Sequence, residues 1–189
     1  MKTRKLGKTG IEVSELVLGG GYVGGILLQP DEKEKLRAVQ YAMDCGINLI
    51  DTAPSYGNGE SEKAVGKLLP QLTPRPYLAT KVQIDPLIRD DLAGQVEKSI
   101  TASLTRLETS SVDIIQLHNP LGKEDDIKHL GGDHLLGEDG VIKALHKAKD
   151  SGLTKYVGIT ALGNPTSCQI AIETDAFDTA QVYLSLIHI

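Results

Sequence analysis

The sequence predicts an α/β fold built around a parallel sheet. Strand-like and helix-like segments alternate along the chain without a break. The strand-like segments are short runs rich in β-branched residues and leucine, which is typical of strands buried on both faces. Polar residues follow several of these runs, and they converge only if the strands are parallel and their carboxyl ends share one edge. The length of 189 residues suggests one domain.

Capping and turn residues bound the expected elements. The first helix begins after Pro30 with Asp31 as its cap and stops at Gly46. Prolines mark the connection to the third strand, and a polar, glycine-rich insertion over 121–139 follows the fourth. In chain order, the expected strands are 16–19, 48–51, 77–81, 112–118, 156–160 and 179–183. The expected helices are 31–45, 61–69, 91–107, 141–150 and 165–173.

Four chemically different side chains lie at the ends of three consecutive expected strands. Asp51 ends the second strand and Tyr56 follows it, while Lys81 and His118 end the third and fourth. A phenol is a poor acid at neutral pH, but a nearby ammonium stabilises its phenolate, and Lys81 could do this for Tyr56. Asp51 would hold Lys81 charged and oriented. His118 could donate a hydrogen bond to the same substrate oxygen that Tyr56 protonates.

These residue types suit proton transfer to a carbonyl oxygen while a second group supplies a hydride. No side chain carries a hydride, so a cofactor is required. Taken singly, each residue has a structural alternative: Asp51 and Lys81 as a buried ion pair, His118 as a core histidine, and Tyr56 as a loop residue packed on Pro54. Their occurrence together at successive strand ends favours the functional interpretation.

The same residues lie in segments that resemble the aldo-keto reductases. The likeness runs from the amino terminus to about Tyr183. It implies a (β/α)8 TIM barrel that uses NADP or NAD. The matching segments are Arg-Lys-Leu-Gly-Lys-Thr-Gly-Ile-Glu-Val-Ser at 4–14, Asp-Thr-Ala-Pro-Ser-Tyr-Gly at 51–57, Glu-Ser-Glu at 60–62, Lys81, His-Asn-Pro at 118–120 and Val-Gly-Ile-Thr at 157–160.

The resemblance also implies roles. Tyr56 is expected to be the general acid and base, tuned by Lys81 and Asp51, and His118 is expected to orient the substrate. The residues implied for the nicotinamide carboxamide are Thr160, Ala161 and Gln181. Many members have Ser-Asn where this chain has Thr-Ala, so the hydroxyl is kept and the amide is lost. The expected activity is hydride transfer between the nicotinamide and an aldehyde, ketone or aldose or its alcohol, and segments 118–120 and 158–163 are most similar to the aldose and galactose dehydrogenase branch.

Six strands are two short of a closed barrel, which takes about 250 residues. We therefore expect residues 1–183 to form a partial aldo-keto reductase barrel, truncated after about six βα units. Residues 184–189 depart from the family pattern and are expected to be a non-native tail. The family binds the adenosine half of its cofactor further along the chain, so the sequence does not choose between NADP and NAD. Two alternatives stay open: a nucleotide-sensing module, as in the potassium-channel β subunits, and an inactive fragment.

A glycine run follows the first strand. Residues 19–24 satisfy the G-x-G-x-x-G pattern, which could indicate a Rossmann nucleotide-binding fold. In a Rossmann fold the helix begins inside the motif, whereas here residues 25–30 delay it. We interpret Gly20 and Gly21 instead as part of a flexible first βα loop, where the backbone approaches the cofactor or substrate.

The insertion over 121–139 contains acidic residues and histidines that could suggest a metal site. Their spacing matches no ligand motif, so we interpret the stretch as a solvated loop and expect no metal. Because it lies on the same face as His118, it is expected to border the substrate pocket. The residues concerned are Asp125, Asp126, His129, Asp133 and His134.

Composition limits the classes of partner. The net charge of −5 argues against a nucleic-acid surface, and no apolar run approaches the roughly 18 residues that cross a bilayer. No secretory signal is seen, and Cys45 and Cys168 are expected to be free, buried thiols, which fits a cytoplasmic location. The expected partner is a small carbonyl or sugar substrate.

Overall fold

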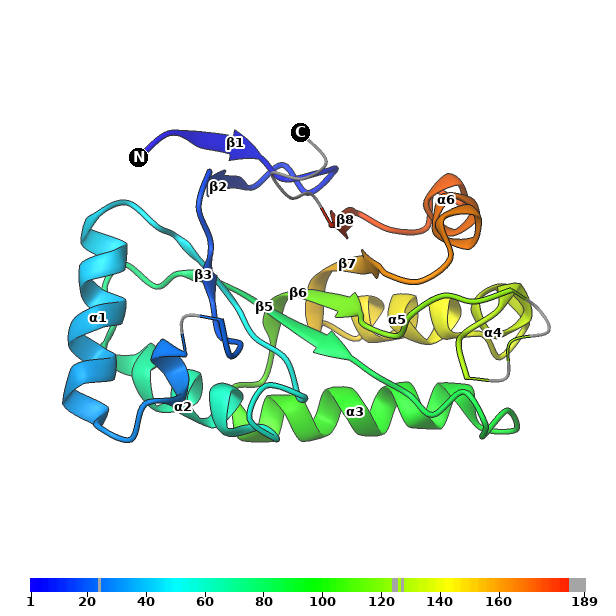
Figure 1. Ribbon diagram of the computed structural model, residues 1–189, viewed down its shortest axis with the longest axis horizontal. Helices are drawn as coiled ribbons and strands as arrows, with labels where there is room; N and C mark the ends of the chain where they lie inside the picture. Colours follow the sequence, from blue (N-terminus) through cyan, green and yellow to red (C-terminus); the bar gives the residue numbers. More distant parts are fainter. Residues whose placement is uncertain (24, 124–125, 127, 184–189) are drawn as a thin grey trace.

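A curved, parallel, six-stranded sheet forms the centre of the computed structural model, which describes residues 1–23, 25–123, 126 and 128–183. Every neighbouring pair of strands in it is parallel, in the order β3-β4-β5-β6-β7-β8. The strands are β3 (Leu18–Gly19), β4 (Leu49–Asp51), β5 (Tyr77–Val82), β6 (Val112–Leu117), β7 (Thr154–Ala161) and β8 (Thr179–Val182). The expected α/β fold is therefore confirmed (Figure 1).

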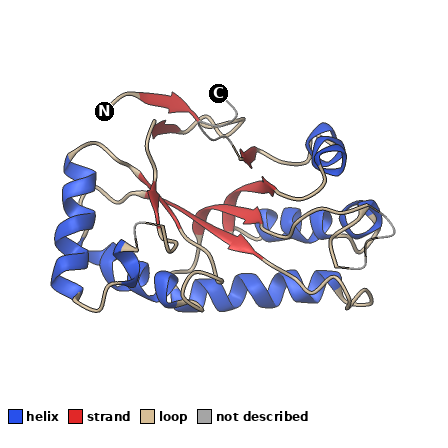
Figure 2. Ribbon diagram, viewed as in Figure 1, coloured by secondary structure: helices blue, strands red, loops and turns tan. Residues whose placement is uncertain are grey.

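Helices surround the sheet on its outer side, as Figure 2 shows. Asp31 caps α1, since its carboxylate accepts hydrogen bonds from two backbone amides of the first turn, and Gly46 beyond the helix adopts a left-handed φ of 96°. The helices are α1 (Glu32–Asp44), α2 (Glu60–Leu68), α3 (Leu92–Arg106), α4 (Gly132–Leu136), α5 (Val141–Asp150) and α6 (Pro165–Glu173), with 3-10 turns η1 (Ile26–Leu28) and η2 (Leu69–Gln71).

Two apolar clusters lie on opposite faces of the sheet. Because side chains alternate along a strand, Leu78 packs outward against the helices while Ala79 points inward. Similarly, Ile115 belongs to the outer cluster and Ile114 to the inner one. The outer cluster is much larger, and burial of its apolar surface is the main force that holds the helices on the sheet.

An amino-terminal hairpin, which the sequence did not lead us to expect, covers one end of the inner face. It pairs β1 (Thr3–Lys5) with β2 (Glu12–Ser14), and Val13 joins the inner apolar cluster. Asn48, just before β4, fastens it by accepting a hydrogen bond from the Ser14 amide at 2.8 Å. The hairpin therefore closes the inner face at the amino-terminal ends of the strands. Its three-residue strands are too short for a clear alternating pattern.

The insertion over 121–139 is partly packed and partly solvated in the part that the structure describes, since residues 136–139 are exposed. It includes the short helix α4, and Leu130 and Leu135 are buried. His134 is buried too, and its Nδ1 accepts a hydrogen bond from the Gly131 amide at 3.0 Å. Asp125 lies outside the described residues. Among those described, no group of three or more metal-ligating side chains comes together.

Three further expectations concern other parts of the chain. Both cysteines are free, and Cys168 is buried as expected, but Cys45, at the end of α1, is exposed. Residues 184–189, the expected non-native tail, lie outside the described residues. No helix in the described ranges is long and apolar enough to cross a membrane.

Candidate active site

The inner face of the sheet changes from apolar to polar toward the carboxyl ends of the strands. Ala79 and Lys81 of β5 point to the same inner face, and Ala79 lies in the apolar cluster. Lys81 lies nearer the carboxyl end and is paired in register with Gln116 of β6, which is paired with Gly158 of β7. Lys81 and Gln116 thus form a polar row across the inner face. This row lies where parallel α/β folds carry their functional groups.

Lys81 is the centre of the site. Its side chain is 1% exposed, and its ammonium donates to Oδ2 of Asp51 at 2.6 Å, to the carbonyl of Thr52 at 2.9 Å and to the hydroxyl of Tyr56 at 3.3 Å. An ammonium has three protons, so each has one acceptor. The structure thus brings together the carboxylate, the ammonium and the phenol that the sequence placed on separate segments.

Burial controls the electrostatics of this group. It raises the pKa of the Asp51 carboxyl, and the ammonium of Lys81 opposes that rise. Burial also lowers the pKa of His118 to about 4, with a further contribution from the positive charge of Lys81. His118 is therefore neutral at physiological pH, so its imidazole carries one N–H donor and one acceptor nitrogen. Its ring lies edge-on to that of Tyr56, with centroids 6.2 Å apart.

The loop between β4 and α2 places Tyr56. The Tyr56 amide donates to the carbonyl of Ala53 at 3.1 Å, and its carbonyl accepts from the Ser61 amide at 3.3 Å. Between these bonds, residues 57–59 all have positive φ, which turns the chain sharply into α2. The hydroxyls of Thr52 and Ser61 are hydrogen-bonded at 2.8 Å and tie the two ends of the loop together. Tyr56 is thus held half-buried at the mouth of the site.

Gly20 and Gly21 lie beside this loop. The Gly20 amide donates to the carbonyl of Asp51 at 2.8 Å, and a Cβ at Gly20 would lie 2.4 Å from the hydroxyl of Ser61. Gly20 is therefore buried, and only a residue without a side chain fits there. A Cβ at Gly21 would lie 3.6 Å from the ring of Tyr56, so Gly21 borders the phenol. Contact of either glycine with a cofactor stays a prediction.

The residues expected at the nicotinamide carboxamide lie on two adjacent strands. Thr160 of β7 and Gln181 of β8 are paired in register, and Ala161 is half-buried next to Thr160. The Thr160 hydroxyl donates to the carbonyl of Leu117 at 2.8 Å, which leaves its oxygen free to accept. The side chain of Gln181 is exposed. These residues lie together, and their role as ligands stays a prediction.

Asn119 and Gln116 were not among the expected site residues. Asn119 is buried next to His118, and its amide group bonds both the amide and the carbonyl of Ile84, at 2.9 Å and 2.7 Å. It therefore fixes the ends of β5 and β6 relative to each other. Its position directly after His118 was the signal that could have identified it. Gln116 gave no such signal, because a single glutamine in a strand has no distinctive pattern.

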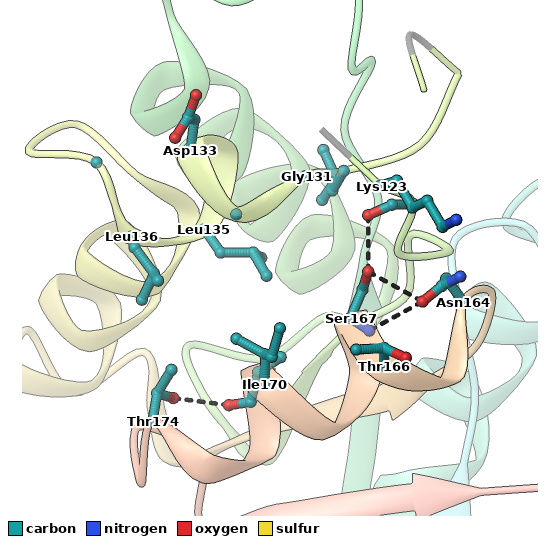
Figure 3. Close-up of a pocket in the computed structure, with 15 residues that line it drawn as sticks. Lys123, Gly131, Asp133, Leu135, Leu136, Asn164, Thr166, Ser167, Ile170 and Thr174 are labelled. Carbon is teal, nitrogen blue, oxygen red and sulfur yellow. Dashed lines mark hydrogen bonds between the residues drawn. The ribbon is translucent and has the colours of Figure 1, made fainter. Parts of the chain in front are cut away.

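A cavity of about 940 Å³ lies between α6 and the insertion (Figure 3). Leu135 and Ile170 form part of its apolar wall, and Asn164 and Ser167 contribute polar atoms at the start of α6. None of the four expected catalytic residues lines it. The expectation that the insertion borders the substrate pocket therefore stays a prediction.

The parallel α/β barrel fold and the cluster of Tyr56, Lys81, Asp51 and His118 together define the class of protein. The sequence model of the aldo/keto reductase family matches residues 15–187, and the chain belongs to this family. It is 37% identical over 165 residues to L-galactose dehydrogenase of Arabidopsis thaliana, an alignment that covers 86% of this chain and 49% of that protein. The chain spans about half the length of the curated relatives it matches.

Solved structures agree with this assignment. The holo form of an aldo-keto reductase from Bacillus halodurans superposes with a TM-score of 0.73 at 29% identity, covering 98% of this chain and 58% of that one. An aldo/keto reductase from Klebsiella pneumoniae in complex with NADP and acetate has a TM-score of 0.65 at 25% identity, covering 89% and 52%. The expected barrel fold of aldo-keto reductase type is confirmed, with six parallel strands in the described residues.

Proposed function

We propose that this protein is an NAD(P)-dependent oxidoreductase that interconverts the carbonyl group of an aldehyde, ketone or aldose with the corresponding alcohol. The observation that carries the proposal is the position of the Lys81 ammonium, buried between the carboxylate of Asp51 and the hydroxyl of Tyr56. An ammonium in this position stabilises the phenolate that remains after Tyr56 gives up its proton.

The donor set of the site fits a nicotinamide cofactor. A carboxamide needs both donors and acceptors, and the hydroxyl of Thr160 and the amide of Gln181 offer both from paired positions on adjacent strands. Gly21 adds a surface without a side chain beside the phenol. Thr160, Ala161 and Gln181 would hold the carboxamide, and Gly20 and Gly21 would border the ring. The bound nicotinamide would supply or accept the hydride.

In the reducing direction, Tyr56 donates its phenolic proton to the substrate carbonyl oxygen. Lys81 stabilises the phenolate left behind, and Asp51 keeps the ammonium in place. Neutral His118 donates a hydrogen bond to the same oxygen, which orients the carbonyl toward the phenol. In the oxidising direction, the phenolate of Tyr56 takes the proton from the alcohol.

The family relationship supports both the substrate class and the cofactor. The similarity to L-galactose dehydrogenase favours a sugar-type substrate, and the solved complex of a relative with NADP favours a pyridine nucleotide. We infer that the protein binds NADP or NAD and acts in the cytoplasm, where free thiols such as Cys45 and Cys168 are stable.

The test is a fluorescence titration of the 189-residue chain with NADPH and NADH, combined with a nucleotide-oxidation assay on a panel of aldoses and small aldehydes. We expect saturable binding and turnover, with turnover lost in Tyr56→Phe. Tight binding without turnover of any substrate would support a nucleotide-sensing module instead. Neither binding nor turnover, in a chain that melts cooperatively, would contradict the proposal.

A further inference from the structure

A buried carboxylate lies directly behind the site and takes no part in the chemistry described above. Glu62, in the first turn of α2, has a fully buried side chain. Its Oε1 accepts a hydrogen bond from the hydroxyl of Thr80, and its Oε2 accepts one from Nε of Arg106 at 2.6 Å. Burial of such a pair costs desolvation free energy, and hydrophobic residues of similar size often stabilise a fold equally well. Stability alone is therefore a weak explanation for its presence.

One contact of Glu62 leads to Lys81. Thr80 lies on the helix-facing side of β5, and Lys81, the next residue, points to the inner face. The hydrogen bond between Glu62 and Thr80 thus fixes α2 to β5 next to the backbone of Lys81, whose side chain extends to Tyr56. A shift of this bond would move the backbone that carries the ammonium.

The other contact leads to the loop that carries Tyr56. The side chain of Arg106 lies against Gly59, where a Cβ would be 2.6 Å from Cδ of the arginine. Gly59 has a φ of 89° and is the last of the three left-handed residues that follow Tyr56. Arg106 ends α3, and this end of the helix packs closely on α2: a Cβ at Gly66 would lie 2.8 Å from the carbonyl carbon of Leu107.

We infer that Glu62 and Arg106 are positioning residues that set the separation between the Tyr56 hydroxyl and the Lys81 ammonium. Glu62 bonds to Thr80, the neighbour of Lys81, and Arg106 contacts Gly59 in the loop that carries Tyr56. The pair therefore touches the two segments whose side chains meet in the 3.3 Å contact between the lysine ammonium and the tyrosine hydroxyl. That contact is at the long end of hydrogen-bond distances, so a displacement of a few tenths of an ångström breaks it. The expected loss of turnover rests on the proposed function, whereas the expected change in the position of Tyr56 does not.

The decisive variant is Glu62→Gln, which keeps the shape of the side chain and removes its charge. Its matched control is Asp113→Asn, because Asp113 is also a buried carboxylate paired with an arginine, Arg75, at 3.1 Å. Asp113 lies near the start of β6, at the opposite end of the strands from the site. Each variant removes the charge of one buried carboxylate: Asp113 pairs with Arg75 and also with Lys155 at 2.9 Å, and Glu62 pairs with Arg106. Only the Glu62 pair contacts the loop that carries Tyr56.

The first readout is the ring signal of Tyr56 in a carbon–proton NMR spectrum of the chain with labelled tyrosine. The chain has six tyrosines, and the Tyr56 signal is identified by its loss in Tyr56→Phe. We expect Glu62→Gln to shift or broaden this signal and leave the other five in place, and Asp113→Asn to leave the Tyr56 signal unchanged. An unchanged Tyr56 signal in Glu62→Gln, or an equal change in both variants, would overturn the inference.

A second pair of variants at Arg106 covers the case in which Glu62→Gln does not fold. Arg106→Lys keeps a cation and the methylenes over Gly59 and should retain the wild-type Tyr56 signal, whereas Arg106→Met should perturb it. Identical spectra for these two variants would count against a positioning role.

The second readout is turnover. We expect Glu62→Gln to lower kcat by about 10- to 100-fold, as small misplacements of catalytic groups do, while the KM for the nucleotide changes less than about threefold. Asp113→Asn should keep kcat within about threefold of wild type. If the wild-type chain shows no turnover, the proposed function fails, and the NMR comparison still decides whether Glu62 positions Tyr56.

Discussion

The Nζ atom of Lys81 lies 2.6 Å from Oδ2 of Asp51, on the inner face of the sheet. Both side chains are almost out of contact with solvent. A pair at this distance in a region of low dielectric is strongly attractive, and its geometry is stiff because each partner is also held by its own strand. The ammonium is therefore already in position before any ligand binds. Catalysis by charge stabilisation depends on such preorganisation.

Tyr56→Phe removes the acid without disturbing the shape of the site. We expect turnover to fall by several powers of ten while nucleotide binding changes less than about threefold, because the phenol acts mainly in the transition state. Steady-state nucleotide oxidation and fluorescence titration measure the two quantities separately. Tyr77→Phe, a change at a half-buried tyrosine on the inner face of β5, serves as the control and should leave both unchanged. Turnover within tenfold of wild type in Tyr56→Phe would remove Tyr56 from the mechanism.

Lys81→Met tests the charge pair through stability. The substitution leaves the Asp51 carboxylate buried without its cation, which costs about 3–5 kcal/mol in the free energy of unfolding. Adding Asp51→Asn removes the uncompensated charge, so the double variant should be more stable than Lys81→Met alone. Urea denaturation followed by circular dichroism gives both values. A double variant that is less stable than the single one would show that Asp51 is not charged in the folded protein.

His118 predicts how stability depends on pH. Its pKa of about 4 in the folded protein lies below the ordinary value of 6.5, so the unfolded chain takes up the proton first as the pH falls. The contribution of His118 is therefore complete above pH 6.5 and is lost between about pH 6.5 and 4. Because the ring is only partly buried, we expect a loss on the order of 1 kcal/mol.

The measurement is the free energy of unfolding as a function of pH for the wild type and for His118→Leu. Other groups titrate in this range in both proteins, so the difference between the two curves isolates the histidine. We expect the wild type to lose stability relative to the variant as the pH falls. A difference that stays constant from pH 7 to 4.5 would show that His118 has an ordinary pKa.

Much of the fold could be predicted from the sequence because its signals are local. The expected helices 141–150 and 165–173 agree with the observed bounds of α5 and α6, and the other expected helices agree to within a residue at each end. The first expected strand was less accurate: only Leu18–Gly19 of 16–19 pairs with a neighbour. Leu16 and Val17 are exposed, so an apolar run alone did not mark the strand.

The parts that could not be predicted depend on contacts between distant segments. Three exposed residues at Thr3–Lys5 become a strand only because Glu12–Ser14 pairs with them and Asn48 anchors the result. The same holds for Glu62, whose partners Thr80 and Arg106 come from two later elements. The convergence of Asp51, Tyr56 and Lys81 was easier to predict, because parallel strands bring their carboxyl ends together whatever the rest of the chain does.

Gly158 of β7 is paired with Gln116 of the polar row, and a substitution there tests how closely this part of the inner face is packed. A Cβ at this position would lie 2.2 Å from the hydroxyl oxygen of Thr179 and 3.1 Å from Cγ of Gln116. Gly158→Ala should therefore overpack the inner face and lower the free energy of unfolding by about 1–3 kcal/mol. Thr179→Ala removes the atom that clashes first, so the double variant should recover a substantial part of that loss.

A double-mutant cycle on thermal and urea denaturation measures this coupling. Because the Thr179 hydroxyl is buried and has no hydrogen-bond partner among the described residues, Thr179→Ala alone should cost little. The matched control for Gly158→Ala is Gly152→Ala, since a Cβ at Gly152 meets no atom within 4 Å. Gly152 has a φ of 75°, so this control loses stability through backbone strain, and Thr179→Ala should not restore it. Recovery that is equal for both glycines would mean that the hydroxyl of Thr179 does not occupy the space beside Gly158.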